Sequence, residues 1–180
     1  MTKAIATSVL VLAMAAPAFA QGKVLAEALD RMHANVARNV VEAAEKMPEA
    51  EFGFQPTKDV RTFAGFVGHV ANAEFGYCAR VKGEANPNKQ DFEKIVGKAA
   101  LVAGIKAAVA YCDAVYKLQS DASLSEMITM GQSQQPRGQV LVQNISHTNE
   151  HYGNLVTYMR IKGLVPPSTE RATTTRVGGR

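Results

Sequence analysis

Apolar residues recur at steps of three and four along four long stretches of the chain, and this spacing is the strongest constraint on its fold. The stretches cover approximately residues 25–47, 60–82, 91–118 and 139–162, and we expect the third to be a short helical piece followed by a long Ala-rich helix. Such a spacing places the apolar side chains on one face of a helix. Pro48 stops the first stretch, and Gly163 followed by Pro166 ends the last. Because strand-like alternation is nearly absent, we predict an all-α four-helix bundle.

The connection between the third and fourth stretches, SDASLSEMITMGQSQQPRG, is long. Its residues Ser123 to Glu126 fit the capping-box pattern, in which a Ser and a Glu three residues later cap the same helix start. We therefore expect one short helical turn inside this connection.

The first twenty residues, MTKAIATSVLVLAMAAPAFA, have the pattern of a secretory signal peptide. A short cationic start at Lys3 precedes an apolar run, and the small residues Ala18 and Ala20 precede the expected cleavage site. We predict cleavage before Gln21 and a periplasmic or secreted protein; an uncleaved N-terminal anchor is the alternative. We see no second long apolar segment and expect no membrane association after cleavage.

The remaining residues fit one domain by size, with a bundle over residues 21–168 and a disordered basic tail over 169–180. The chain has 20 basic and 16 acidic residues, and loss of Lys3 with the signal peptide leaves a net charge of about +3. The basic residues are scattered among carboxylates rather than gathered on one face. This distribution argues against a nucleic-acid partner.

Three of the four histidines have the spacing of a metal site. In H-T-N-E-H, His147 and His151 stand four residues apart and point to the same side of a helix. His69 lies at the margin of the apolar face of the second helix. Three imidazoles without a fourth protein ligand form an open site for one divalent ion. Imidazole suits Zn, Ni, Fe or Cu, and we expect Zn or Ni first.

Other polar residues near these histidines could support the ligands or contact a substrate. They are Glu74, Asn149, Glu150 and Tyr152. H-x-x-E-H is also a peptidase pattern, in which Glu150 would be the general base and a later glutamate the third ligand. Only Glu170 follows, in the expected tail, and we set this reading aside. No other residue of a metal-ligating type lies beside His33 on its helix, and we expect His33 at the surface.

Two segments resemble the DinB-like family of four-helix metal-dependent enzymes. They are EKMPEAEFGFQPTKDVRTFAGFVGHVANAE and PRGQVLVQNISHTNEHYGNLVTYMRIKGLVPPS. The family's motif, one His on the second helix and H-x3-H on the fourth, is matched at His69, His147 and His151. The resemblance implies an up-down-down-up topology, in which the second and third helices are parallel.

The two cysteines, Cys78 and Cys112, are either a disulfide or two separate buried thiols on the evidence of the residues alone. The parallel second and third helices that the resemblance implies would place both cysteines at a similar height. The resemblance therefore favours the disulfide.

Members of the family that the chain resembles include hydrolases and transferases or isomerases that use low-molecular-weight thiols. The resemblance thus implies a metal-dependent hydrolase or thiol-dependent transferase acting on a small molecule. The alternative is a non-catalytic extracytoplasmic module, in which the three histidines clamp two helices together. A homodimer is common among such bundles, but no stripe of residues requires one here.

Overall fold

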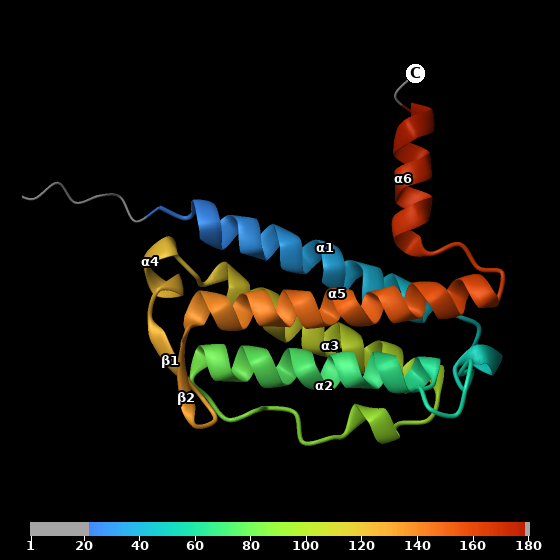
Figure 1. The fold of residues 1–180 in the computed structure, drawn as a ribbon, viewed down its shortest axis with the longest axis horizontal. Coiled ribbons are helices and arrows are strands. Elements are labelled where there is room, and N and C mark those ends of the chain that lie inside the picture. The colour runs from blue at the N-terminus through green and yellow to red at the C-terminus, as the bar shows by residue number, and fades with distance from the viewer. Residues whose placement is uncertain (1–21, 179–180) are drawn as a thin grey trace, which may run out of the picture.

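Four long helices form the bundle in the computed structural model, which describes residues 22–178 (Figure 1). They are α1 (Val24–Lys46), α2 (Phe63–Lys82), α3 (Lys98–Lys117) and α5 (Arg137–Ile161). α1 and α5 run in one direction and α2 and α3 in the other, which confirms the all-α, up-down-down-up bundle. α1 and α2 each pack against both α3 and α5. The predicted signal peptide lies outside the described residues.

Local sequence explains where the helices begin and end. The Thr62 side chain accepts a hydrogen bond from the Gly65 backbone N–H and caps the start of α2. Gly83, with a φ of 74°, closes α2 in the left-handed conformation that glycine adopts without strain. Gly163 does the same after α5 with a φ of 73°. These signals place the two helices that carry the predicted metal ligands close to their predicted ranges.

Two apolar clusters fill the interior of the bundle. The first includes Phe63, Phe66, Val67, Ile105, Leu155 and Met159, and the second includes Val36, Val81, Val115, Tyr116, Val140 and Leu141. Leu25 and Met32, which share the apolar periodicity of the first helix, are nevertheless 63% and 55% exposed. In this part of α1 the apolar face is therefore wider than the surface that the other helices cover.

Cys78 and Cys112 form a disulfide that joins α2 to α3, with their Cα atoms 5.4 Å apart. Both residues lie late in their helices and are fully buried. The parallel course of α2 and α3 brings them to the same level, as a disulfide requires.

The third predicted stretch is divided into a short piece and a long helix, as expected. Residues Phe92–Lys94 form a 3₁₀ turn, η2, and Gly97 with a φ of 109° separates it from α3. Phe92 is buried, and Gly68 and Gly104 make room for it because a Cβ on either residue would collide with Phe92 atoms. Gly68 thus lets η2 lie directly against α2, and Gly104 admits the Phe92 ring beside α3.

By length and composition alone, α3 is long and apolar enough to cross a membrane. The sequence had been expected to contain no second long apolar segment. In the structure α3 packs against α1 and α2, with Leu101, Ile105 and Ala108 fully buried. Its apolar character therefore serves the core of the bundle here.

The long connection before α5 contains more structure than one helical turn. The capping box lies at Ser120 and Ser123, three residues before the predicted one, and starts α4 (Asp121–Leu124). Two short antiparallel strands follow, β1 (Met127–Met130) and β2 (Ser133–Pro136), which the sequence analysis did not anticipate. Gly131, with a φ of 62°, allows the tight turn between them.

The predicted disordered tail differs from the structure, because residues Pro167–Gly178 form a further helix, α6. Pro167 occupies the first helical position, where its fixed φ suits a helix start. Glu170 pairs with Lys46, and Arg171 bonds to Glu42 of α1. α6 projects away from the bundle beyond these contacts (Figure 1).

Candidate metal centre

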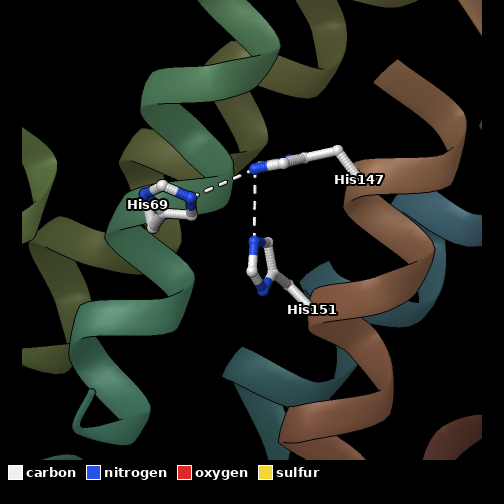
Figure 2. Close-up of side chains that lie close together, drawn as sticks. All are labelled: His69, His147 and His151. Atoms are coloured by element: carbon white, nitrogen blue, oxygen red, sulfur yellow. Dashed lines mark hydrogen bonds between the residues drawn. The ribbon is translucent and has the colours of Figure 1, made fainter. Parts of the chain in front are cut away.

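The three predicted histidines converge between α2 and α5 (Figure 2). His69 extends from α2, and His147 and His151 extend from successive turns of α5. The Nε2 atom of His147 lies 3.1 Å from Nε2 of His69 and 3.2 Å from Nε2 of His151. The same ring nitrogen of each side chain therefore faces the shared space.

Hydrogen bonds on the outer side of two of the rings determine which nitrogen of each ring carries the proton. Nδ1 of His69 lies 2.7 Å from a carboxylate oxygen of Glu93, and Nδ1 of His151 lies 3.2 Å from the amide oxygen of Asn154. Because both oxygens can only accept, each Nδ1 carries the proton and donates it. Each Nε2 is then left with a lone pair directed at the centre.

Burial keeps two of the rings neutral. Removal from water, together with the charges of His151 and His69, lowers the pKa of His147 to about 4. Burial also lowers the pKa of His151. Neutral imidazole is the form that binds a metal ion, so both rings are ready to act as ligands near neutral pH.

The geometry fits a divalent ion. Ligand nitrogens at about 2.0–2.1 Å from a tetrahedral ion are about 3.3 Å apart, close to the 3.1 and 3.2 Å observed here. Lone pairs facing one another at this distance repel unless a cation lies among them. The His69 side chain is 25% exposed, so solvent reaches the centre. An ion held by these three side chains would keep one position open to a small molecule.

Glu93 is a supporting residue that the sequence analysis missed. It stands 24 residues after His69, in η2, and its second oxygen accepts a hydrogen bond from Arg61 Nε at 3.1 Å. A ligand histidine commonly has such a carboxylate behind it, which fixes the ring and its tautomer. The available signal was Gly68, directly before His69, because its missing side chain lets η2 approach.

Three predicted neighbours of the triad have other positions or contacts. Asn149 is exposed and faces α1, where it lines a hollow with Met32 and Val36. Tyr152 is buried, and its hydroxyl donates to Ser168 rather than facing the triad. Glu150 is exposed, and its charge acts to raise the pKa of both His147 and His151.

Glu74 and His33 form a separate buried group. The His33 Nε2 atom lies 2.8 Å from Glu74 Oε2, and Thr148 donates to Glu74 Oε1 at 2.7 Å. The expectation that His33 lies at the surface was wrong, because this carboxylate and stacking on Tyr116 satisfy the ring inside the bundle. Glu74 acts on the triad through its negative charge, which works to raise the pKa of His147.

The fold is shared with several solved structures. A DinB-like protein from Bacillus cereus superposes with a TM-score of 0.68 at 16% identity, covering 78% of this chain and 95% of that one. A DinB-like protein from Bacillus subtilis gives 0.62 at 18% identity, with coverages of 76% and 92%. A mycothiol-dependent maleylpyruvate isomerase gives 0.60 at 17% identity, covering 72% of this chain and 60% of that one.

Because these sequence identities are low, the superpositions show that the fold is shared and do not show a shared function. No curated protein matches the sequence. The family model of the DinB superfamily matches residues 32–155, which include all three histidines and most of the bundle. The chain therefore belongs to the DinB superfamily.

Proposed function

We propose that the protein binds one divalent metal ion through His69, His147 and His151 and is a metal-dependent hydrolase or thiol-dependent transferase. The observation that carries this proposal is the convergence of three Nε2 atoms within 4.8 Å of one another. Zn and Ni are the ions we expect first, since both accept imidazole ligands. Such an ion would supply Lewis acidity at an open position, which activates water or a thiol as a nucleophile.

The protein's own residues prepare the site for this role. Glu93 and Asn154 hold the Nδ1 protons of His69 and His151 and so keep both Nε2 atoms available. Arg61 bonds to the far oxygen of Glu93 and limits its movement. No carboxylate or second base contacts the centre from inside the bundle among the residues that the structure describes. We therefore expect the ion to provide most of the activation.

The thiol-dependent alternative has one further support. One structure with the same fold is named a mycothiol-dependent isomerase. A transferase or isomerase of that kind needs a centre open to a small thiol and its acceptor together. The exposure of His69 at the edge of the triad suits such a substrate pair. We propose small molecules as substrates for both reaction types.

Elemental analysis followed by an activity screen tests the proposal. We expect one equivalent of metal in the wild-type protein and less than about a tenth of that after His147→Ala, since two imidazoles bind far more weakly than three. Asn149→Ala is the matched control, because this residue lies two positions away on α5 and faces α1. Equal metal contents in the two variants would refute the site. The loaded wild type is then screened on esters, amides and thiol conjugates.

A structural clamp is the second candidate. The ligands come from α2 and α5, which the described disulfide does not join, so an ion here would cross-link a second pair of helices. A clamp predicts a large fall in Tm on chelation with no activity in the screen. Activity that depends on the ion would favour the enzyme.

A further inference from the structure

A second group of metal-ligand side chains lies in the bundle, away from the triad. His33 of α1, Glu74 of α2 and Cys112 of α3 are all fully buried, and their ligand atoms lie within 4.8 Å of one another. Cys78 is bonded to Cys112 and brings a second sulfur to the same place. In the oxidised protein these sulfurs are not available, because a metal ligand must be a thiolate.

The surroundings of this group are those of a supported metal site. On the far side of the His33 ring, Nδ1 lies 3.2 Å from Asp113 Oδ1, and both atoms are buried without another hydrogen-bond partner among the described residues. A small rotation of the ring would make this contact the carboxylate–histidine pair that supports many ligand histidines. His33 Nε2 faces the opposite way, toward Glu74.

The remaining groups prepare the carboxylate and the sulfurs. Thr148 donates to Oε1 of Glu74, and Oε2, which accepts from the Asn144 amide at 3.2 Å, faces His33 as the ligand atom. The amide nitrogen of Asn144 lies 3.7 Å from the sulfur of Cys112 and 4.0 Å from that of Cys78. An N–H group at this place would stabilise negative charge on the sulfurs once they are thiolates.

We propose that reduction of the Cys78–Cys112 disulfide turns this group into a site for one divalent ion, bound by His33 Nε2, Glu74 Oε2 and the two thiolates. Two thiolates with an imidazole and a carboxylate are a ligand set that suits Zn²⁺. The site is gated by redox state, because the same two sulfurs either bond to each other or bind the ion.

The chemistry balances with a dithiol as the reductant. The dithiol gives two electrons and two protons to the disulfide, which becomes two thiols, and is itself oxidised to a disulfide. Binding of the ion then releases both thiol protons and the proton that His33 Nε2 shares with Glu74. The sulfurs must move to about 3.8 Å apart, the spacing of two thiolates at about 2.3 Å from a tetrahedral ion. Reduction itself requires such a movement, because unbonded sulfurs cannot stay at bonding distance.

Titration of the full chain with Co²⁺ tests this site separately from the triad. After metal removal, one sample is kept oxidised and the other is reduced with a dithiol without oxygen and then freed of the dithiol, which would itself bind Co²⁺. Only the buried group contains sulfur, so a sulfur-to-cobalt charge-transfer band reports that group alone. We expect the band and one additional equivalent of Co²⁺ in the reduced sample, and neither in the oxidised sample.

Two variants locate the ligands. Reduced His33→Gln should lose the additional equivalent and keep the ion of the triad, whereas reduced His147→Ala should keep the band. Failure of the triad proposal and failure of this one are therefore distinguishable. A reduced wild-type chain without the band overturns the inference, as does a band of equal strength in reduced His33→Gln.

A matched pair of cysteine variants removes the disulfide without any reductant. Cys78→Ser and Cys112→Ser each keep one thiolate together with His33 and Glu74, so both should show the band unreduced, at about half its strength in the reduced wild type because one sulfur is lost. Absence of the band from both variants contradicts the assignment. Circular dichroism accompanies each titration. Because the ligands come from three helices, a chain that gains neither helix nor band on addition of Co²⁺ also contradicts it.

Discussion

Replacement of Glu93 by Ala is the sharpest test of how the metal centre is built. In the wild type the Glu93 carboxylate accepts the Nδ1 proton of His69 at 2.7 Å and leaves the lone pair on Nε2. Without it, the proton can move to Nε2 and block the ligand atom. Loss of such a supporting carboxylate weakens metal binding by about 10- to 100-fold, which corresponds to about 1.4–2.7 kcal/mol. The Glu93 side chain is partly exposed, so we expect the lower half of this range.

Competition with a chromophoric chelator measures the affinity of the oxidised protein for Zn²⁺. Glu93→Gln keeps an acceptor oxygen but loses the charge, and should fall between wild type and Glu93→Ala. Lys94→Ala is the matched control, because this side chain is 83% exposed on the same turn and pairs with Asp91. The fold of each variant is checked by its Tm.

The reasoning is wrong if Glu93→Ala binds Zn²⁺ within about twofold of wild type, well below the smallest loss expected. It is also wrong if Lys94→Ala loses as much affinity as Glu93→Ala. Either result would mean that the His69 ring is held by its packing in α2 and not by the carboxylate.

Three further predictions concern the scaffold. Gly68→Ala should displace η2, because its Cβ would collide with the Phe92 backbone, and should lower both Tm and Zn²⁺ affinity in the chelator assay. Burial lowers the pKa of His33, but the hydrogen bond and charge of Glu74 raise it above its ordinary value overall. The unfolding free energy of the oxidised protein should therefore fall as pH rises above about 6.5 through the folded pKa, and urea titrations should show a flatter profile for His33→Gln. The disulfide closes a loop with a sequence separation of 34, so its reduction without metal should cost about 4 kcal/mol in the same urea assay. A loss of unfolding free energy below about 1 kcal/mol would mean that the disulfide does not restrict the unfolded chain as this argument requires.

Local patterns in the sequence were sufficient for the bundle and for two of the three histidines of the candidate metal centre. The three- and four-residue apolar spacing depends only on helix geometry, so the ranges of α1, α2 and α5 could be predicted within a few residues, whereas the third predicted stretch also covers η2. The i, i+4 spacing likewise put His147 and His151 on one side of a helix. His69 required a further assumption, that α2 and α5 are neighbours; its position at the margin of an apolar face suggested this, and the family motif then matched it.

Contacts between distant segments could not be predicted in this way. Glu93 reaches His69 only because Gly68 admits η2, and no periodic pattern marks that approach. His33 looked like a surface residue because its partner, Glu74, lies 41 residues away on another helix. We predicted a disordered tail from its composition, but residues 167–178 form α6, which contacts α1.

The sequence by itself therefore determined the helices, their apolar faces and the pair of histidines on α5, because each depends on residues within one or two turns. Only the tertiary structure decided which ring nitrogen faces the centre, which carboxylate supports His69 and where His33 and Glu74 are buried. Those features depend on distances across helices, and a shift of one helix turn would separate every one of these pairs.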